Sequence, residues 1–167
     1  MIEIVEADIT LLEVDAIVNA ANEALRGGAG VDGAVHRAAG PELLAECKLH
    51  PGCPTGQGVL TKGYRLPARF VIHVVGPVWQ GGGGEREREL LESAYKSAFH
   101  LAREEGSIRS IAFPAISTGV YRFPRADAAS IALTVMRRHQ GAFDRIVACL
   151  FDRENVELYR ALLGSDV

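Results

Sequence analysis

The residues best suited to chemistry stand close together near the start of the chain. Asn19 and Asn22 follow the apolar run 16–18, and residues 27–30 read Gly-Gly-Ala-Gly. Glycine-rich backbone that leads into a helix presents free N–H groups, which bind phosphate well. An amide side chain both donates and accepts hydrogen bonds, so it can bridge neighbouring ribose hydroxyls. Although Asn also favours ordinary turns, the combination predicts a site for a phosphorylated nucleoside, with chemistry at one end.

Asp32 and His36 have the functional groups for that chemistry. They stand four positions apart in a segment with a helical pattern, so they share one helix face. A carboxylate beside a bound substrate can orient or deprotonate a water molecule, and an imidazole can assist it. The alternative is an Asp favoured by the helix dipole together with an unrelated helical His. The adjoining glycine-rich segment favours the catalytic interpretation.

A second loop carries hydroxyl groups next to a glycine. Residues 116–121 read Ile-Ser-Thr-Gly-Val-Tyr and follow a strand-like run over 110–113. Because the hydroxyls can bind an anion and the glycine lets backbone come close, we predict a second phosphate-binding loop. Tyr121 and Phe123 are candidates to wall a sugar. The alternative is an ordinary loop with aromatic cover.

Two further candidates follow the first and last strand-like runs. Asp8 comes after the run 2–5 and could accept a hydrogen bond from the exocyclic amine of a purine. Its alternative role is to cap a short turn. Phe151 ends the run 145–151 and could either stack on a base or complete the core.

Four other features do not point to a further functional site. Residues 28–33 match G-x-G-x-x-G, but a dinucleotide fold places this motif directly after its first strand, which is not the case here. Cys47, His50 and Cys53 have a spacing seen in zinc sites, yet a fourth ligand is missing nearby, so we expect no metal. The run 81–84 lacks the ending of a P-loop and is predicted to be a surface loop. His73, inside an apolar run, is predicted to be a core histidine with satisfied polar atoms.

The elements that must position these residues alternate between short apolar runs and helical patterns. Strands are expected over 2–5, 16–18, 58–62, 70–75, 110–113 and 145–151, and helices over 31–39, 85–105, 124–139 and 154–163. The break at Gly40-Pro41 ends the first helix. Repeated strand–loop–helix order predicts an α/β fold with helices on both faces of a largely parallel sheet. Ligands bind beyond the carboxyl ends of such strands, which points to the loops 19–31, 114–123 and 151–153.

Bulk properties limit the number of domains and the kinds of partner. The chain has 167 residues, of which 48% are hydrophobic and 23% charged, so we expect one domain over 1–167. The net charge is −3 without a dense Lys/Arg run, so we expect no nucleic-acid partner. Apolar runs fall short of the ~18 residues that span a bilayer, and we see no signal peptide. Together with three cysteines, which cannot all pair, this predicts a cytoplasmic protein without a membrane partner.

Taken together, several segments resemble a macrodomain of the MacroD type. They are Ala-Asp-Ile-Thr at 7–10, Val-Asn-Ala-Ala-Asn at 18–22, the run 27–40, Cys-Pro-Thr-Gly at 53–56, Val-Ile-His-Val-Val-Gly-Pro at 71–77 and Ile-Ser-Thr-Gly-Val-Tyr-Arg-Phe-Pro at 116–124. The segments occur in the family's order, and the similarity covers nearly the whole chain. Ala7 and Ala29 depart from the family, which often has Gly at both positions, but neither change removes a functional group.

The resemblance implies a three-layer α/β/α domain with a central mixed sheet that binds ADP-ribose. It also implies hydrolysis of the ester joining mono-ADP-ribose to Asp or Glu side chains of proteins, and of O-acetyl-ADP-ribose, without a metal or cofactor. The catalytic residues would be Asn19, Asn22, Asp32 and His36. The ligand-binding residues would be Asp8, Ile9, Ala21, Gly30, Val31, Ser117, Thr118, Gly119, Val120, Tyr121 and Phe151. The main alternative is a module that binds ADP-ribose without cleaving it.

Overall fold

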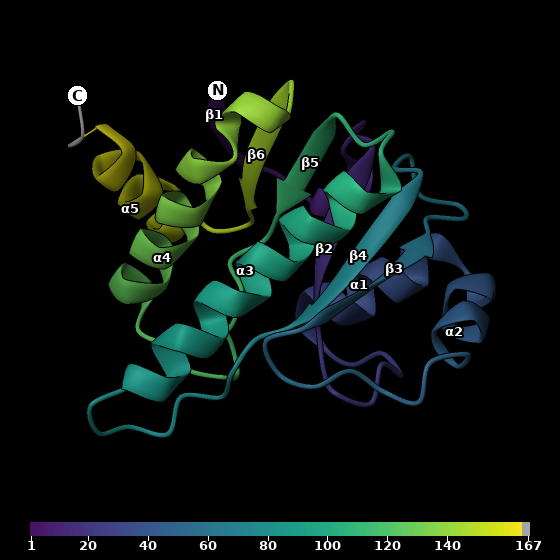
Figure 1. The fold of residues 1–167 in the computed structure, drawn as a ribbon, viewed down its shortest axis with the longest axis horizontal. Coiled ribbons are helices and arrows are strands. Elements are labelled where there is room, and N and C mark those ends of the chain that lie inside the picture. The colour runs from purple at the N-terminus through teal and green to yellow at the C-terminus, as the bar shows by residue number, and fades with distance from the viewer. Residues whose placement is uncertain (165–167) are drawn as a thin grey trace.

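A six-stranded sheet forms the centre of the computed structural model, which describes residues 1–164 (Figure 1). The strands are β1 (Ile2–Glu6), β2 (Ala16–Ala21), β3 (Gly58–Lys62), β4 (Phe70–Val75), β5 (Ser110–Phe113) and β6 (Arg145–Leu150). They lie in the order β1-β6-β5-β2-β4-β3, and every neighbouring pair is parallel except β3 and β4. The sheet is therefore mixed, as the resemblance implies.

Helices cover both faces of this sheet and complete three layers. One face carries α1 (Gly30–Ala39) and α2 (Pro41–Cys47), and the other carries α3 (Glu85–Glu105), α4 (Arg125–Arg138) and α5 (Arg153–Gly164) (Figure 1). Single 3-10 turns span Ile9–Leu11 and Gln140–Ala142. Within residues 1–164, no helix has the length and apolar character needed to cross a membrane.

The inner strands β2, β4, β5 and β6 are apolar along most of their length because each face of the sheet has its own core. Ile17 packs in the core on the α1 and α2 side, whereas the next residue, Val18, packs in the core on the side of α3, α4 and α5. A strand buried on both faces has no solvent side, so the alternation of polar and apolar residues disappears. Asn19 and His73 are the polar exceptions in β2 and β4, and they stand opposite each other in the register.

Most of the expected elements are confirmed, with two differences close to the candidate site. The strand expected over 16–18 continues to Ala21, because its pairing with β4 runs on to Val75, so Asn19 lies inside β2 rather than at its exit. The Gly40-Pro41 break ends α1 as expected, but it also begins α2, which was not predicted. Gly40 has φ +89 and allows the change of direction, and the fixed φ of Pro41 suits the first position of a new helix.

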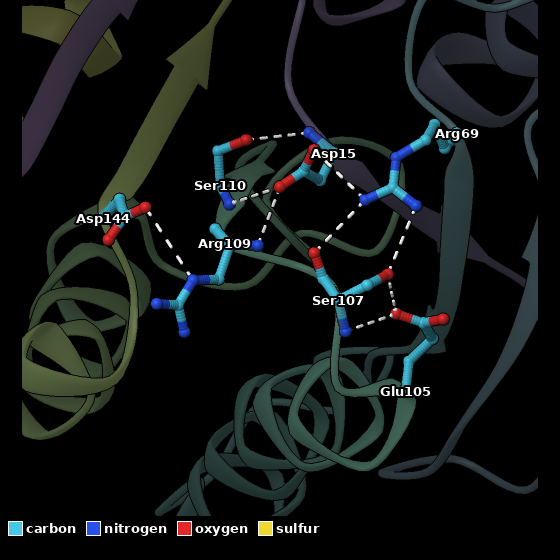
Figure 2. A network of polar contacts seen from close by, with 7 residues as sticks. All are labelled: Asp15, Arg69, Glu105, Ser107, Arg109, Ser110 and Asp144. Carbon is cyan, nitrogen blue, oxygen red and sulfur yellow. Dashed lines mark hydrogen bonds and ion pairs between the residues drawn. The ribbon is translucent and has the colours of Figure 1, made fainter.

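A polar network ties together the amino ends of β2, β4, β5 and β6 (Figure 2). Asp15 accepts hydrogen bonds from the backbone N–H groups of Arg109 at 2.7 Å and Ser110 at 3.1 Å. Arg69 forms an ion pair with Asp15 at 3.3 Å, and Arg109 forms one with Asp144 at 3.8 Å. Because these residues precede their strands, the network braces the end of the sheet opposite the predicted ligand loops.

Candidate functional site

A cleft opens at the carboxyl ends of the parallel strands, where the loops after β1, β2, β5 and β6 meet. It consists of two hollows that share Gly30, Val31 and Phe151. The first hollow has a volume of about 320 Å³ and lies between the glycine-rich segment and the loop after β5. The second hollow has a volume of about 590 Å³ and lies against the residues that follow β1. A ligand with two unlike halves can therefore extend from one hollow into the other.

The structure brings most of the predicted site residues to this cleft. The first hollow is lined by residues from both predicted phosphate loops and from the exit of β6, namely Ala21, Asn22, Gly30, Val31, Asp32, Ser117, Thr118, Gly119, Val120, Tyr121 and Phe151. Asp8 and Ile9 line the second hollow. Asn19 and His36 line neither hollow, and both contact Asp32 instead. Asn19 and His36 can therefore affect a ligand either through Asp32 or by contacting ligand atoms that extend beyond Asp32.

Asp32 is a buried acid in the first turn of α1, with only 6% of its surface exposed. Asn19 Nδ2 donates to Asp32 Oδ1 over 2.8 Å, and His36 Nε2 lies 3.5 Å from the same oxygen. Burial raises the pKa of the Asp32 carboxyl above its ordinary value, while the Asn19 hydrogen bond and the His36 charge oppose the rise. A carboxylate with a raised pKa binds a proton more readily, so Asp32 is suited to accept one from water.

The Asn22 side chain forms hydrogen bonds with backbone groups at the start of the glycine-rich segment and just before it. Its Nδ2 donates to the Gly27 carbonyl over 3.1 Å, and its Oδ1 accepts from the Leu25 N–H over 3.0 Å. The turn interpretation of Asn22 is thus confirmed, although the residue also lines the first hollow. Gly30 begins α1 with φ +61, and no side chain caps this helix. The N–H groups of its first turn are therefore available to an anion.

Contacts outside the cleft hold the loop after β5 in place. Ser117 is buried with φ +68, and its carbonyl accepts from the Phe123 N–H over 2.8 Å. The Trp79 N–H donates to the Tyr121 carbonyl over 2.8 Å. Phe123 is only 2% exposed and packs on Trp79, with ring centroids 5.0 Å apart. The expectation that Phe123 walls a sugar is wrong, because this aromatic contact draws it into the core. Tyr121 does line the cleft.

The side chains of Asp8 and Phe151 differ in how much of each remains available to contact a ligand. Asp8 Oδ1 accepts from the Thr10 N–H at 2.9 Å and the Thr10 hydroxyl at 2.7 Å, which confirms the turn-capping interpretation. These contacts use one carboxylate oxygen, so the other can still accept from a ligand. Phe151 is 74% exposed and lines both hollows. It therefore does not complete the core, and its ring is free to stack on a flat group.

The sequence reasoning missed three polar residues that line the first hollow: Arg125, Asp152 and Asn155. Asp152 Oδ1 accepts from the Asn155 N–H over 2.7 Å, and Asp152 Oδ2 accepts from Asn155 Nδ2 over 3.2 Å. Arg125 Nη1 lies 2.5 Å from Glu154 Oε2. An available signal was the Asp at the exit of the last strand, since Asp commonly caps the first turn of a helix.

The cysteines are buried and poorly suited to nucleophilic chemistry. Burial raises the pKa of the Cys47 thiol and of the Cys149 thiol to about 11, and it also raises that of Cys53. A protonated thiol is a weak nucleophile. Across the part of the chain that the structure describes, no group of three or more His, Cys, Asp or Glu side chains is placed to hold a metal ion.

Comparisons with known proteins give a consistent result. The Macro domain family matches residues 18–132. ADP-ribose glycohydrolase MACROD2 of Homo sapiens is 50% identical over 168 residues, which covers 98% of this chain and 39% of that protein. An Oceanobacillus iheyensis macrodomain with ADP is 41% identical with a TM-score of 0.92, covering 98% of this chain and 90% of the other. A Trypanosoma brucei macrodomain in complex with ADP-ribose is 44% identical with a TM-score of 0.89, covering 98% and 69%. The chain therefore belongs to the Macro domain family.

Proposed function

We propose that this protein binds ADP-ribose and hydrolyses the ester that links mono-ADP-ribose to Asp or Glu side chains of proteins, and O-acetyl-ADP-ribose as well. Binding is supported by the similar macrodomains solved with ADP and ADP-ribose, and hydrolysis by the name of the MACROD2 relative. The proposal of hydrolysis rests on Asp32, because this residue is a buried carboxylate with a raised pKa that lines the first hollow.

In the proposed complex the ligand extends along the cleft. The adenine occupies the second hollow, where Asp8 accepts from its exocyclic amine and Phe151 stacks on its face. The diphosphate lies between the N-terminus of α1 and the loop after β5, where backbone N–H groups offset its charge. The chain as a whole carries a net charge of −3, so these local donors, rather than a general positive field, attract the anion. The distal ribose then lies beside Asp32.

Asp32 acts as the general base in this proposal. Its carboxylate takes a proton from a water molecule while the water oxygen forms a bond to the ester carbonyl carbon or to the anomeric carbon of the ribose. The bond to the leaving group breaks, and that group departs as the ribose hydroxyl in the first case or as the carboxylate in the second. A positioned general base contributes about 10²–10⁴-fold to such a rate. Binding of the ester and the water side by side adds to it.

Replacement of Asp32 tests the proposal directly. In Asp32→Asn, release of ADP-ribose from an Asp/Glu-modified protein should fall by about 10²–10⁴-fold, because the amide cannot accept the proton. The affinity for ADP-ribose, measured by calorimetry, should stay within about tenfold, since the remaining contacts are intact. Asp144→Asn is the matched control, because Asp144 is 76% exposed at the other end of the sheet. Full turnover in Asp32→Asn would refute the assignment of Asp32 as the base.

Two further outcomes separate the possible chemistries. If the wild-type protein binds ADP-ribose but releases none from a modified protein, it is a module that recognises ADP-ribose without cleaving it. If it is active, hydrolysis in ¹⁸O-labelled water identifies the attacked atom. Label in the released carboxylate indicates attack on the carbonyl carbon, and label in the ribose indicates attack on the anomeric carbon.

A further inference from the structure

A buried histidine contacts the residue that holds Asp32, and the mechanism above does not use it. His73 of β4 is only 1% exposed. Its Nδ1 lies 3.1 Å from Asn19 Nδ2, and its Nε2 lies 3.0 Å from Thr61 Oγ1 of β3. Asn19 Nδ2 also donates to Asp32 Oδ1 over 2.8 Å. These four buried side chains form one continuous series of contacts from β3 to α1.

The protonation state of His73 follows from its surroundings. Burial, assisted by the charges of His36 and His50, lowers the pKa of His73 to about 3. The ring is therefore neutral near pH 7, with one nitrogen that donates and one that accepts. Which nitrogen carries the proton depends on the groups that the ring contacts.

The contacts of the Asn19 amide indicate which of these two forms is present. One atom of its amide lies within hydrogen-bond distance of both Asp32 Oδ1 and His73 Nδ1. If Asp32 is ionised, that atom must be the nitrogen, because an oxygen in its place would face a carboxylate at 2.8 Å. The nitrogen has two hydrogens and donates to both neighbours. His73 Nδ1 is then the acceptor, and Nε2 carries the proton.

Thr61 completes this arrangement on the other side of the ring. The His73 Nε2–H donates to Thr61 Oγ1, and the Thr61 hydroxyl donates onward to the Lys62 carbonyl over 3.1 Å. Thr61 is only 2% exposed, so water does not compete for these contacts. Three states are therefore mutually consistent: Asp32 is ionised, the Asn19 amide nitrogen points toward Asp32, and His73 carries its proton on Nε2.

The same orientation leaves one acceptor without a partner. Asn19 Oδ1 is buried and has no hydrogen-bond partner among the described residues. A buried oxygen without a partner costs free energy, so a donor group at this position would be favourable. Asp32 and Ala20, which flank Asn19, both line the first hollow. A hydroxyl group of a ligand bound beside Asp32 is such a donor if the wall of the hollow shifts to admit it, because Asn19 itself is fully buried and lines neither hollow.

We propose that His73 is a positioning residue. It holds the Asn19 amide with its nitrogen toward Asp32, so that Asn19 Oδ1 faces a hydroxyl of the distal ribose and Asp32 stays ionised for catalysis. This inference rests on the proposed function, because the distal ribose and the base are defined there. His73 itself does not touch the substrate, and its whole effect passes through Asn19.

Two amide replacements form a matched pair that tests this role. In His73→Asn the amide oxygen takes the place of Nδ1, so the acceptor for Asn19 remains. In His73→Gln the amide reaches the place of Nε2, so only the contacts with Thr61 and with the Cys47 thiol on that side of the ring remain. Each variant buries one amide group at the same position, so their thermal stabilities should be similar. A difference between them therefore reports on Asn19 and not on the fold.

Ligand binding and turnover should separate the two variants. His73→Gln should lose about three- to tenfold in affinity for ADP-ribose, the size of one hydrogen bond, and a similar or larger factor in kcat. Its affinity for ADP, which lacks the distal ribose, should be unchanged. His73→Asn should resemble the wild type in all three measurements. Equal kcat and an equal ratio of ADP-ribose to ADP affinity in both variants would overturn the proposal.

The form of the His73 ring can be measured in the wild-type protein without any substitution. ¹⁵N chemical shifts of the imidazole should show a neutral ring protonated on Nε2 near neutral pH. A ring protonated on Nδ1 would contradict the inferred orientation of Asn19. This measurement and the ratio of affinities do not require turnover. A protein that binds ADP-ribose but hydrolyses nothing would therefore refute the hydrolase while leaving the role of His73 testable.

Discussion

Asp32 Oδ1 receives two contacts that oppose the effect of burial on its charge. Burial raises the pKa of this carboxyl, whereas the Asn19 hydrogen bond and the His36 charge lower it. Only the ionised form can accept a proton, so turnover should fall as the pH drops through the Asp32 pKa. Because that pKa is raised, the fall should begin at a higher pH than for an exposed Asp.

Replacement of His36 tests this balance. His36→Gln removes the charge that lowers the Asp32 pKa, so the acid limb of kcat/KM against pH should move to higher pH. The affinity for ADP-ribose at neutral pH should change little, because His36 lines neither hollow. A limb that stays in place, or that moves to lower pH, would show that His36 does not act on Asp32 through its charge.

Phe151 offers a second test at the level of a single side chain. It is 74% exposed, so Phe151→Ala should change the free energy of unfolding by less than about 0.5 kcal/mol. If the ring stacks on adenine, the substitution should cost about 1–3 kcal/mol of binding, a loss of roughly 5–150-fold in ADP-ribose affinity by calorimetry. Phe151→Tyr keeps a stacking face and should bind as the wild type does. Unchanged affinity in Phe151→Ala would place the adenine elsewhere.

Helix α1 and the glycine-rich segment must approach each other closely to form the first hollow. A Cβ added to Gly33 would lie 2.4 Å from the Gly28 carbonyl oxygen, closer than such atoms can approach. Gly33→Ala should therefore displace the glycine-rich segment from α1. We expect a stability cost of about 1–3 kcal/mol and weaker ADP-ribose binding.

Gly141→Ala is the matched control for this prediction. A Cβ added to Gly141 would have no atom within 4 Å. This residue lies in the Gln140–Ala142 turn and lines neither hollow. Thermal unfolding and calorimetry should therefore give wild-type values for this variant. If Gly33→Ala bound ADP-ribose as tightly as Gly141→Ala does, close packing of the segment on α1 would not matter for the ligand.

The local sequence was sufficient to predict the elements whose ends are marked by residues that interrupt regular structure, such as glycine. The helix expected over 85–105 agrees with α3, which is flanked by Gly84 and Gly106, both with positive φ. Contacts between distant residues were not predictable in the same way. Asn19 lies inside β2 because this strand pairs with β4 as far as Val75, and His73, 54 positions away, contacts its amide nitrogen. Phe123 is buried because Trp79 packs against it. Both corrections depend on contacts between residues that are far apart in the sequence, and such contacts cannot be predicted from the local sequence alone.

The two ends of the sheet have different tasks in the whole molecule. The carboxyl ends form the cleft, where buried polar atoms such as Ser117 Oγ and Asn155 Oδ1 have no hydrogen-bond partner within the described range 1–164. At the amino ends, Asp15 satisfies its charge with backbone N–H groups and Arg69 (Figure 2). Stability and binding are therefore separable by substitution, because a change at the amino ends leaves the lining of the cleft intact.

Asp15 allows this separation to be tested by pH. Burial alone would raise its pKa, but hydrogen bonds from Arg109 and Ser110 and the contact with Arg69 bring it below the ordinary value of 3.8. A lowered pKa in the folded state means that the carboxylate stabilises the fold at pH values above 3.8. This contribution is lost as the pH falls through the lowered pKa, because the proton then binds the folded and unfolded chains alike.

Asp15→Asn should therefore lower the thermal midpoint by about 2–6 °C near neutral pH, and the difference from the wild type should shrink in acid. The affinity for ADP-ribose at a temperature well below the midpoint should be unchanged, because Asp15 does not line the cleft. Asp144→Asn, at an exposed position of the same network, should lower the midpoint much less. An equal loss for Asp15→Asn at every pH would mean that shape rather than charge holds the strands together here. Weakened binding in that variant would show that the amino ends also support the cleft.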